Sequence, residues 1–141
     1  MSEIKMRENE KKLKVFSFFA GSGLLDLAFE NSGFQIDFVN EYFDPFLDAY
    51  QYSRNKMSIP LPTHGCHNDS IEAFLGEKRA LLSRCLQNSK QDAALVGFVG
   101  GPPCPDFSIG GKNRGAAGDN GRLSSVYVDL IINEQPDWFL F

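Results

Sequence analysis

The sequence predicts an α/β fold in which helices cover both faces of a parallel sheet. Two observations support this fold class. Short apolar runs alternate with segments of helical pattern along the chain, which is typical of repeated β-α-β units. Glycine-containing turns also follow the first and fourth apolar runs, at the end of the strand where such sheets bind ligands. The composition, with 43% hydrophobic and 23% charged residues, fits an ordinary globular domain.

Each expected element has its own signal. Five apolar runs predict strands: residues 13–19, 36–40, 64–68, 93–99 and 138–141, the third with a weak signal. Helical composition lies between them at residues 24–31, 45–55, 71–91 and 123–134. Gly33 is expected to end the first helix, Pro45 suits the first turn of the second, and Gly76 interrupts the third. A glycine turn at residues 20–23 and a glycine-rich loop at residues 110–121 complete the expected order.

The length of 141 residues fits one domain. Residues 1–12 are polar and charged and are expected to form a flexible tail, so the domain is assigned to residues 13–141. A buried parallel strand normally delivers a loop at its carboxyl end, and the sequence stops inside the last apolar run. We therefore expect the catalytic unit to be incomplete at its carboxyl end.

Charge and cysteine content restrict the functions open to the chain. A formal net charge of −4 argues against holding nucleic acid by bulk electrostatics, so a DNA-binding role needs a local basic patch or a second polypeptide. The three cysteines are widely spaced, which does not suggest a disulfide framework and favours a reducing cytoplasm. Neither a secretory signal nor an apolar run of membrane-spanning length is found in the sequence.

A metal site is conceivable at residues 64–67, because His64, Cys66 and His67 are three candidate ligands within four residues. A structural zinc site needs a fourth ligand and usually a second pair, and neither is evident in the sequence. We therefore predict no metal site.

The segment 99–108, VGGPPCPDFS, is the most informative part of the sequence. Gly101 allows a ligand close to the backbone, while Pro102 and Pro103 fix φ and remove backbone donors. Together they hold the Cys104 thiol rigidly at the carboxyl end of a predicted strand, which favours a nucleophile. The alternative is a small buried cysteine in an ordinary turn.

A second set of residues indicates a nucleoside ligand. Gly21 and Gly23, with Ser22 between them, stand at a strand-to-helix turn, although Asp26 occupies the place of a third glycine. Glu41 lies 18 residues beyond Gly23, close to the spacing at which an acid receives ribose hydroxyls.

Two further positions extend this hypothesis. Tyr42 is suited to stack on an adenine ring. Asp69 is suited to accept the adenine amino group, and Ser70 follows it. The alternatives remain a solvated acid and a rim aromatic at residues 41–42, and a helix N-cap at Asp69 or Ser70.

With these motifs in place, the chain resembles the cytosine-C5 DNA methyltransferase family over residues 13–141. The matching motifs are the first S-adenosylmethionine motif at residues 19–23, the ribose and adenine motif at residues 40–42, the adenine-binding acid at Asp69, and the nucleophile motif at residues 101–104 with Phe107 and Ser108. The resemblance implies a Rossmann-like S-adenosylmethionine-dependent methyltransferase fold and a role in DNA methylation within restriction-modification.

The resemblance also implies roles for individual residues. The cofactor S-adenosylmethionine would be held by Phe19, Gly21, Ser22, Gly23, Glu41, Tyr42, Asp69, Ser70, Gly101, Pro103 and Leu123. The target base would first be flipped out of double-stranded DNA. The Cys104 thiolate would then add to cytosine C6 and so activate C5 for methyl transfer. A loop closing over DNA would bring Ser108, Lys112, Arg114 and Arg122 to the nucleic acid.

Three departures from the family pattern limit the expectation. Leu24 stands in place of a further glycine, and Pro105 in place of a glutamine. The family's Glu-Asn-Val motif, which supplies an acid to cytosine N3, does not occur in the chain. The resemblance therefore implies that the chain alone is inactive or nearly so. The chain would be either a truncated fragment or a subunit that a second polypeptide completes. Methylation of tRNA cytosine and a nonenzymatic nucleoside-binding role remain alternatives.

Overall fold

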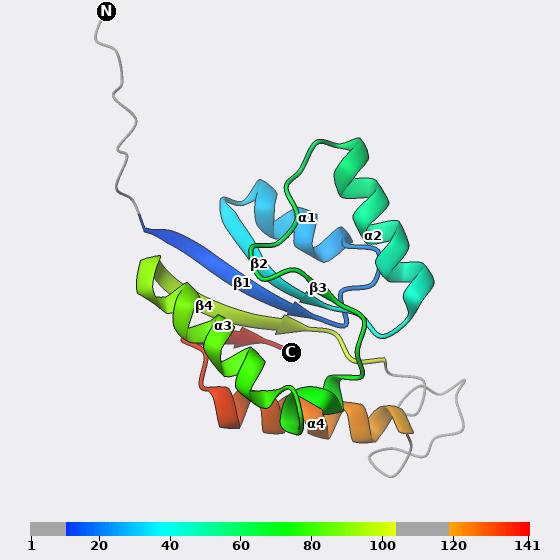
Figure 1. Cartoon of the computed structure of the whole chain (residues 1–141), viewed down its shortest axis with the longest axis vertical. Helices are drawn as coiled ribbons and strands as arrows, with labels where there is room; N and C mark the ends of the chain where they lie inside the picture. The colour runs from blue at the N-terminus through cyan, green and yellow to red at the C-terminus, as the bar shows by residue number, and fades with distance from the viewer. Residues whose placement is uncertain (1–10, 104–118) are drawn as a thin grey trace, which may run out of the picture.

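A computed structural model describes residues 11–103 and 119–141, without the side chains at 119 and 120 (Figure 1). Five parallel strands form one sheet in the order β3-β2-β1-β4-β5. Their bounds are β1 (Lys12–Phe18), β2 (Phe34–Asn40), β3 (Cys66–His67), β4 (Ala93–Gly100) and β5 (Trp138–Leu140). The order reverses between β1 and β4, and α/β sheets of this kind open a ligand crevice at such a point. The predicted fold class is confirmed.

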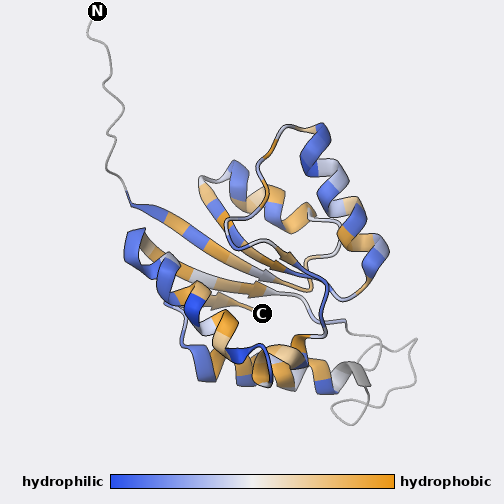
Figure 2. Ribbon diagram, in the orientation of Figure 1, coloured by the Kyte–Doolittle hydropathy of each residue, from blue (hydrophilic) through white to orange (hydrophobic). Residues whose placement is uncertain are grey.

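Helices cover both faces of this sheet (Figure 1). They are α1 (Leu24–Asn31), α2 (Asp44–Lys56), the 3₁₀ helix η1 (Ile71–Leu75), α3 (Arg79–Asp92) and α4 (Asp119–Glu134). Alternate residues of β1 enter two separate cores because successive side chains of a strand point to opposite faces. Val15 packs in the core beneath α1 and α2, whereas Phe16 and Phe18 pack in the core beneath η1, α3 and α4. Figure 2 shows hydrophobic residues concentrated along the strands.

The larger core is built around aromatic rings. Phe16 stacks between Phe38 and Phe98, with ring centroids 5.2 and 5.6 Å away. All three side chains are fully buried. These rings lie on three adjacent strands, so the stack fixes β2, β1 and β4 against one another on the face covered by α3 and α4.

Several boundaries differ from the expected ones. β1 ends at Phe18 because Phe19 adopts the left-handed conformation, with φ of 52°, and cannot continue the strand. α4 begins at Asp119, so the last residues of the expected glycine-rich loop are helical. Lys12 already belongs to β1, while residues 1–10 of the expected tail lie outside the described residues. The expected break at Gly76 is confirmed, since it separates η1 from α3. Of the helices described, none combines the length and apolarity needed to cross a membrane.

A buried ion pair joins the amino-terminal halves of β1 and β2. The Lys14 ammonium lies 3.0 Å from a carboxylate oxygen of Asp37 and 2.7 Å from one of Asp92. Lys14 and Asp37 are buried, and the Ser89 hydroxyl of α3 also donates to Asp37 at 2.5 Å. Burial alone raises the pKa of Asp37, but the hydrogen bonds from Ser89 and Lys14 outweigh it and hold the pKa below its ordinary value.

Replacing Lys14 by Met should destabilise the fold by about 3 kcal/mol, because it leaves the Asp37 carboxylate buried without its cation. Urea unfolding of the purified chain measures this loss. Lys12→Met is the matched control, since Lys12 is on the same strand with an exposed side chain, and it should change stability by less than about 0.5 kcal/mol. Equal losses in the two variants would contradict the assigned role of the pair.

The Lys14→Met penalty should also depend on pH. The folded-state pKa of Asp37 is lowered, so its stabilising contribution is present above the ordinary Asp pKa of about 3.9 and is lost as pH falls through the folded value. The difference in unfolding free energy between wild type and Lys14→Met should therefore shrink below about pH 4. A penalty that stayed constant down to low pH would be inconsistent with an Asp37 partner.

Candidate functional site

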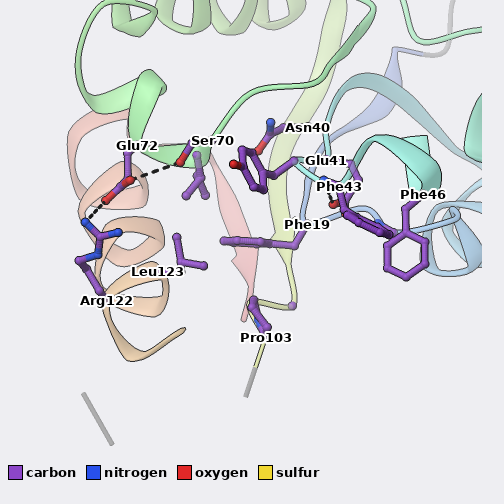
Figure 3. A pocket seen from close by; sticks show the side chains of 14 residues that line it. Phe19, Asn40, Glu41, Phe43, Phe46, Ser70, Glu72, Pro103, Arg122 and Leu123 are labelled. Atoms are coloured by element: carbon purple, nitrogen blue, oxygen red, sulfur yellow. Dashed lines mark hydrogen bonds and ion pairs between the residues drawn. The ribbon is translucent and has the colours of Figure 1, made fainter. Parts of the chain in front are cut away.

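A cavity of about 660 Å³ opens at the carboxyl ends of β1, β2 and β4, next to the reversal in strand order. Its volume lies within the usual range of small-molecule sites. The lining residues are Phe19, Gly21, Asn40, Glu41, Tyr42, Phe43, Phe46, Ser70, Ile71, Glu72, Gly101, Pro103, Arg122 and Leu123. Figure 3 shows Phe43 and Phe46 on one side, Glu72, Arg122 and Leu123 on the other, and Phe19 between them.

The Glu41 carboxylate fixes the glycine turn that follows β1. One oxygen accepts the Gly21 N–H at 2.8 Å and the other accepts the Phe43 N–H at 2.7 Å. Glu41 is 8% exposed and lines the cavity, so a single buried acid joins the turn after β1 to the start of α2. A carboxylate has about four acceptor sites, so capacity for ligand hydroxyl groups remains.

A second buried acid, Asp26, stabilises the same turn by holding the Tyr50 ring against Gly23. Gly23 has a φ of 93°, and a Cβ there would lie 2.6 Å from the Tyr50 ring, so this position requires glycine. The Tyr50 hydroxyl donates to Asp26 at 2.8 Å, and the Ser17 hydroxyl donates to the other oxygen at 2.6 Å. Burial raises the pKa of Asp26, and these hydrogen bonds only partly offset it. Asp26, which stands in the place of a third glycine, is thus a buried anchor of the turn.

The opposite wall comes from β4, η1 and α4. Gly101 and Pro103 follow β4, and Leu123 faces them from α4. An Arg122 guanidinium nitrogen lies 2.8 Å from a Glu72 carboxylate oxygen, which connects α4 to η1 at the rim (Figure 3). Arg122, expected to reach nucleic acid, therefore lies at the cavity with 61% of its side chain exposed.

The aromatic side of the cavity is open to solvent. Tyr42, Phe43 and Phe46 are 72%, 52% and 50% exposed. The Phe43 and Phe46 rings meet edge to face with centroids 5.0 Å apart. Exposed aromatic faces beside a buried acid suit a ligand that has both a flat ring and hydroxyl groups.

The structure brings most of the predicted cofactor residues into one cavity. Those that line it are Phe19, Gly21, Glu41, Tyr42, Ser70, Gly101, Pro103 and Leu123. Ser22 and Gly23 instead line a separate small hollow with Tyr50 and Arg54. Asp69 is not among the lining residues, and one of its carboxylate oxygens lies 2.6 Å from the Lys78 ammonium. The predicted residues Cys104, Ser108, Lys112 and Arg114 lie outside the described residues.

Sequence reasoning missed several lining residues: Asn40, Phe43, Phe46, Ile71 and Glu72. A buried asparagine at the end of an apolar strand was an available signal for Asn40, whose amide donates to the backbone oxygens of His67 and Asp69 at 3.1 and 2.8 Å. The aromatic pair Phe43 and Phe46 follows Glu41 at helical spacing, which was a second signal. No sequence signal was available for Glu72, because only the folded chain brings it to Arg122.

The two histidines of the rejected metal motif have other partners. The His67 ring stacks on Phe38 with centroids 4.4 Å apart, and a ring nitrogen of His64 lies 2.9 Å from the Ser89 hydroxyl. Within residues 11–103 and 119–141, no group of three or more His, Cys, Asp or Glu side chains is arranged to hold a metal ion.

The strand order and the cavity at its reversal define a Rossmann-like α/β domain with a cavity of the size that small-molecule sites have. The family model of C-5 cytosine-specific DNA methylase matches residues 13–141, and the chain belongs to this family.

Curated relatives extend this result. The chain is 54% identical over 140 residues to the type II methyltransferase M.NmeDI of Neisseria meningitidis serogroup C, covering 99% of this chain and 33% of the relative. It is 36% identical to the DNA (cytosine-5-)-methyltransferase M.ApeKI of Aeropyrum pernix, and the match covers 92% of this chain and 28% of that relative. It is 31% identical to the type II methyltransferase M.FnuDI of Fusobacterium nucleatum, and the match covers 91% of this chain and 31% of that relative. The chain spans about a third of the length of these relatives.

Replacing Glu41 by Gln should lower the unfolding free energy by about 2 kcal/mol, because a carboxamide can accept only one of the two backbone N–H groups through its oxygen. Chemical unfolding without ligand measures the loss, and amide exchange at Gly21 should accelerate. Glu77→Gln, at an exposed position, is the control and should leave both measurements near wild type. Unchanged Gly21 exchange in Glu41→Gln would rule out the carboxylate as the anchor of the turn.

Proposed function

We propose that the chain forms the cofactor-binding, nucleophile-bearing part of a DNA (cytosine-5)-methyltransferase that transfers a methyl group from S-adenosylmethionine to cytosine C5. One observation carries the proposal. The cavity joins the glycine turn and Glu41 on one wall to Gly101 and Pro103 on the other, and Cys104 follows Pro103 directly. The candidate nucleophile is therefore next in sequence to a wall of the candidate nucleoside site.

The residues present fit S-adenosylmethionine. The lining is mostly apolar, with Phe19, Ile71 and Leu123 beside the buried Glu41 carboxylate. We assign the ribose hydroxyls to Glu41 and the adenine ring to the aromatic side at Tyr42, with Asp69 as the predicted acceptor of the adenine amino group. When bound, the cofactor supplies an electrophilic methyl group on a sulfonium centre.

The chain's own chemistry rests on Cys104. Its thiolate adds to cytosine C6 with formation of a C–S bond, and the electron pair of the C5–C6 double bond becomes available at C5. After methylation, a base removes the C5 proton, the double bond re-forms, and the C–S bond breaks to release the thiolate. A free thiol has a pKa of about 8.5, so a site with a positive charge beside the thiol would favour the thiolate.

We propose double-stranded DNA as the substrate, with the target base flipped toward Cys104. Ser108, Lys112, Arg114 and Arg122 are proposed to contact it. The residues that recognise the target sequence, and the acid that holds cytosine N3, are proposed to lie outside these 141 residues. A DNA substrate and unpaired cysteines at Cys66 and Cys85 favour the cytoplasm.

The chain should bind S-adenosylmethionine with one-to-one stoichiometry in isothermal titration calorimetry, because the cavity walls come from this chain. Adenosine should compete for the site, since Glu41 and the aromatic side recognise the nucleoside. The Glu77→Gln variant should bind like wild type. Absence of saturable binding by folded wild-type chain would contradict the assigned cofactor.

Cys104→Ala should abolish transfer of a labelled methyl group to DNA, because no thiolate remains to activate C5. The assay uses the chain mixed with the part of M.NmeDI that it does not match, since the chain alone is expected to be inactive. Cys85→Ala is the control, because Cys85 lies in the core beneath α3 and α4, and it should retain transfer. Transfer to tRNA rather than DNA would favour the RNA alternative, and transfer by Cys104→Ala would exclude covalent catalysis by this residue.

A further inference from the structure

We propose that Tyr127, on α4, is a positioning residue that holds Phe19 in the conformation that directs its ring into the cavity. The inference deepens the proposed function, because it takes the cavity to be the cofactor site. It assigns a role to a residue that does not itself line the cavity.

Phe19 has an unfavourable backbone conformation. Its φ of 52° lies in the left-handed region, which bulky residues seldom adopt. Such a conformation persists only where surrounding contacts enforce it, and it is found most often at ligand sites. In Figure 3 the Phe19 side chain extends across the middle of the cavity toward Leu123. Phe19 is thus held in an unusual conformation at the position that separates the two walls.

The Tyr127 ring supplies the enforcing contact. Tyr127 is fully buried, and its ring meets the Phe19 ring edge to face, with centroids 6.0 Å apart and planes at 83°. The same ring lies against Gly100, where a Cβ would approach within 2.7 Å. Gly100 ends β4 and directly precedes the Gly101–Pro103 wall. One ring therefore sets the separation of Phe19 from the opposite wall.

The hydroxyl and the outer face of Tyr127 keep this ring in place. The hydroxyl donates to the Leu140 carbonyl of β5 at 3.2 Å, and the Phe141 ring stacks on Tyr127 with centroids 5.8 Å apart. Burial raises the pKa of Tyr127, so the hydroxyl keeps its proton at neutral pH and remains a donor. The ring is thus supported by β5 on one side and supports the cavity on the other.

Tyr127→Leu should weaken S-adenosylmethionine binding about tenfold, which corresponds to about 1.4 kcal/mol, because Phe19 and Gly100 lose their common support. Tyr127→Phe keeps the ring and should bind within about threefold of wild type, a loss of at most about 0.7 kcal/mol. Leu130→Ala is the control for stability alone, since Leu130 is fully buried on the same helix and does not line the cavity. It should lower the melting temperature but keep wild-type affinity. Wild-type affinity in Tyr127→Leu would overturn the proposal.

Hydrogen exchange tests the same role without ligand. The Ala20 and Gly21 amides, next to Phe19, donate to the Asn40 carbonyl and to Glu41 at 3.2 and 2.8 Å. Their exchange should accelerate about tenfold in Tyr127→Leu, whereas Leu130→Ala should leave it near wild type. If Tyr127→Leu does not fold, Phe19→Leu removes the other ring of the contact and should give the same acceleration. Equal exchange in wild type and the variant that folds would refute the role.

The two tests separate this inference from the proposed function. A wild-type chain that fails to bind S-adenosylmethionine contradicts the cofactor assignment, while accelerated exchange in Tyr127→Leu still supports the role of Tyr127. A wild-type chain that binds, together with a Tyr127→Leu variant that binds and exchanges like it, contradicts only the role of Tyr127.

Discussion

The burial of β1 from Lys14 to Phe18, between two cores and two neighbouring strands, is the constraint on which the rest of the structure depends. Val15 and Phe16 are both fully buried although they face opposite sides of the sheet. β1 also pairs with β2 and β4 along its length, so its backbone polar groups are satisfied on both edges. The chain can leave this strand only at its end, where the left-handed Phe19 and the glycine turn open the cavity.

The cavity is ordered by one buried acid in its wall and by supports that lie behind its lining. Glu41 ties the glycine turn to α2, Asp26 and Tyr50 support the turn from below, and Tyr127 packs behind Phe19. Apolar lining gives a ligand its buried surface, while the anchored carboxylate gives it orientation. The exposed aromatic side next to this acid completes an arrangement suited to a nucleoside.

The apolar runs were enough to predict the sheet, and the glycines and Glu41 were enough to locate the cavity. Local pattern carries this information, because strand burial and tight turns depend on nearby residues. The role of Asp26 could not be predicted from the sequence, since an acid in the first turn of a helix is normally exposed. Asp26 is a buried anchor only because the Ser17 and Tyr50 hydroxyls donate to it. Arg122 and Glu72 show the same limit, because 50 positions separate them in the sequence. The exact end of β1 at Phe18 also depends on a tertiary contact, that between Phe19 and Tyr127.

The Lys14–Asp37 pair lies near the start of β1 and at the middle of β2, whereas the cavity lies at the carboxyl ends of both strands. Lys14 and Phe19 are five residues apart, a span of about 16 Å along an extended chain. Sites separated by more than about 10 Å without shared partners usually have additive free-energy effects. The two ends of the sheet therefore form separate targets for engineering: the charged end can be redesigned for thermal tolerance while ligand specificity is evolved at the other.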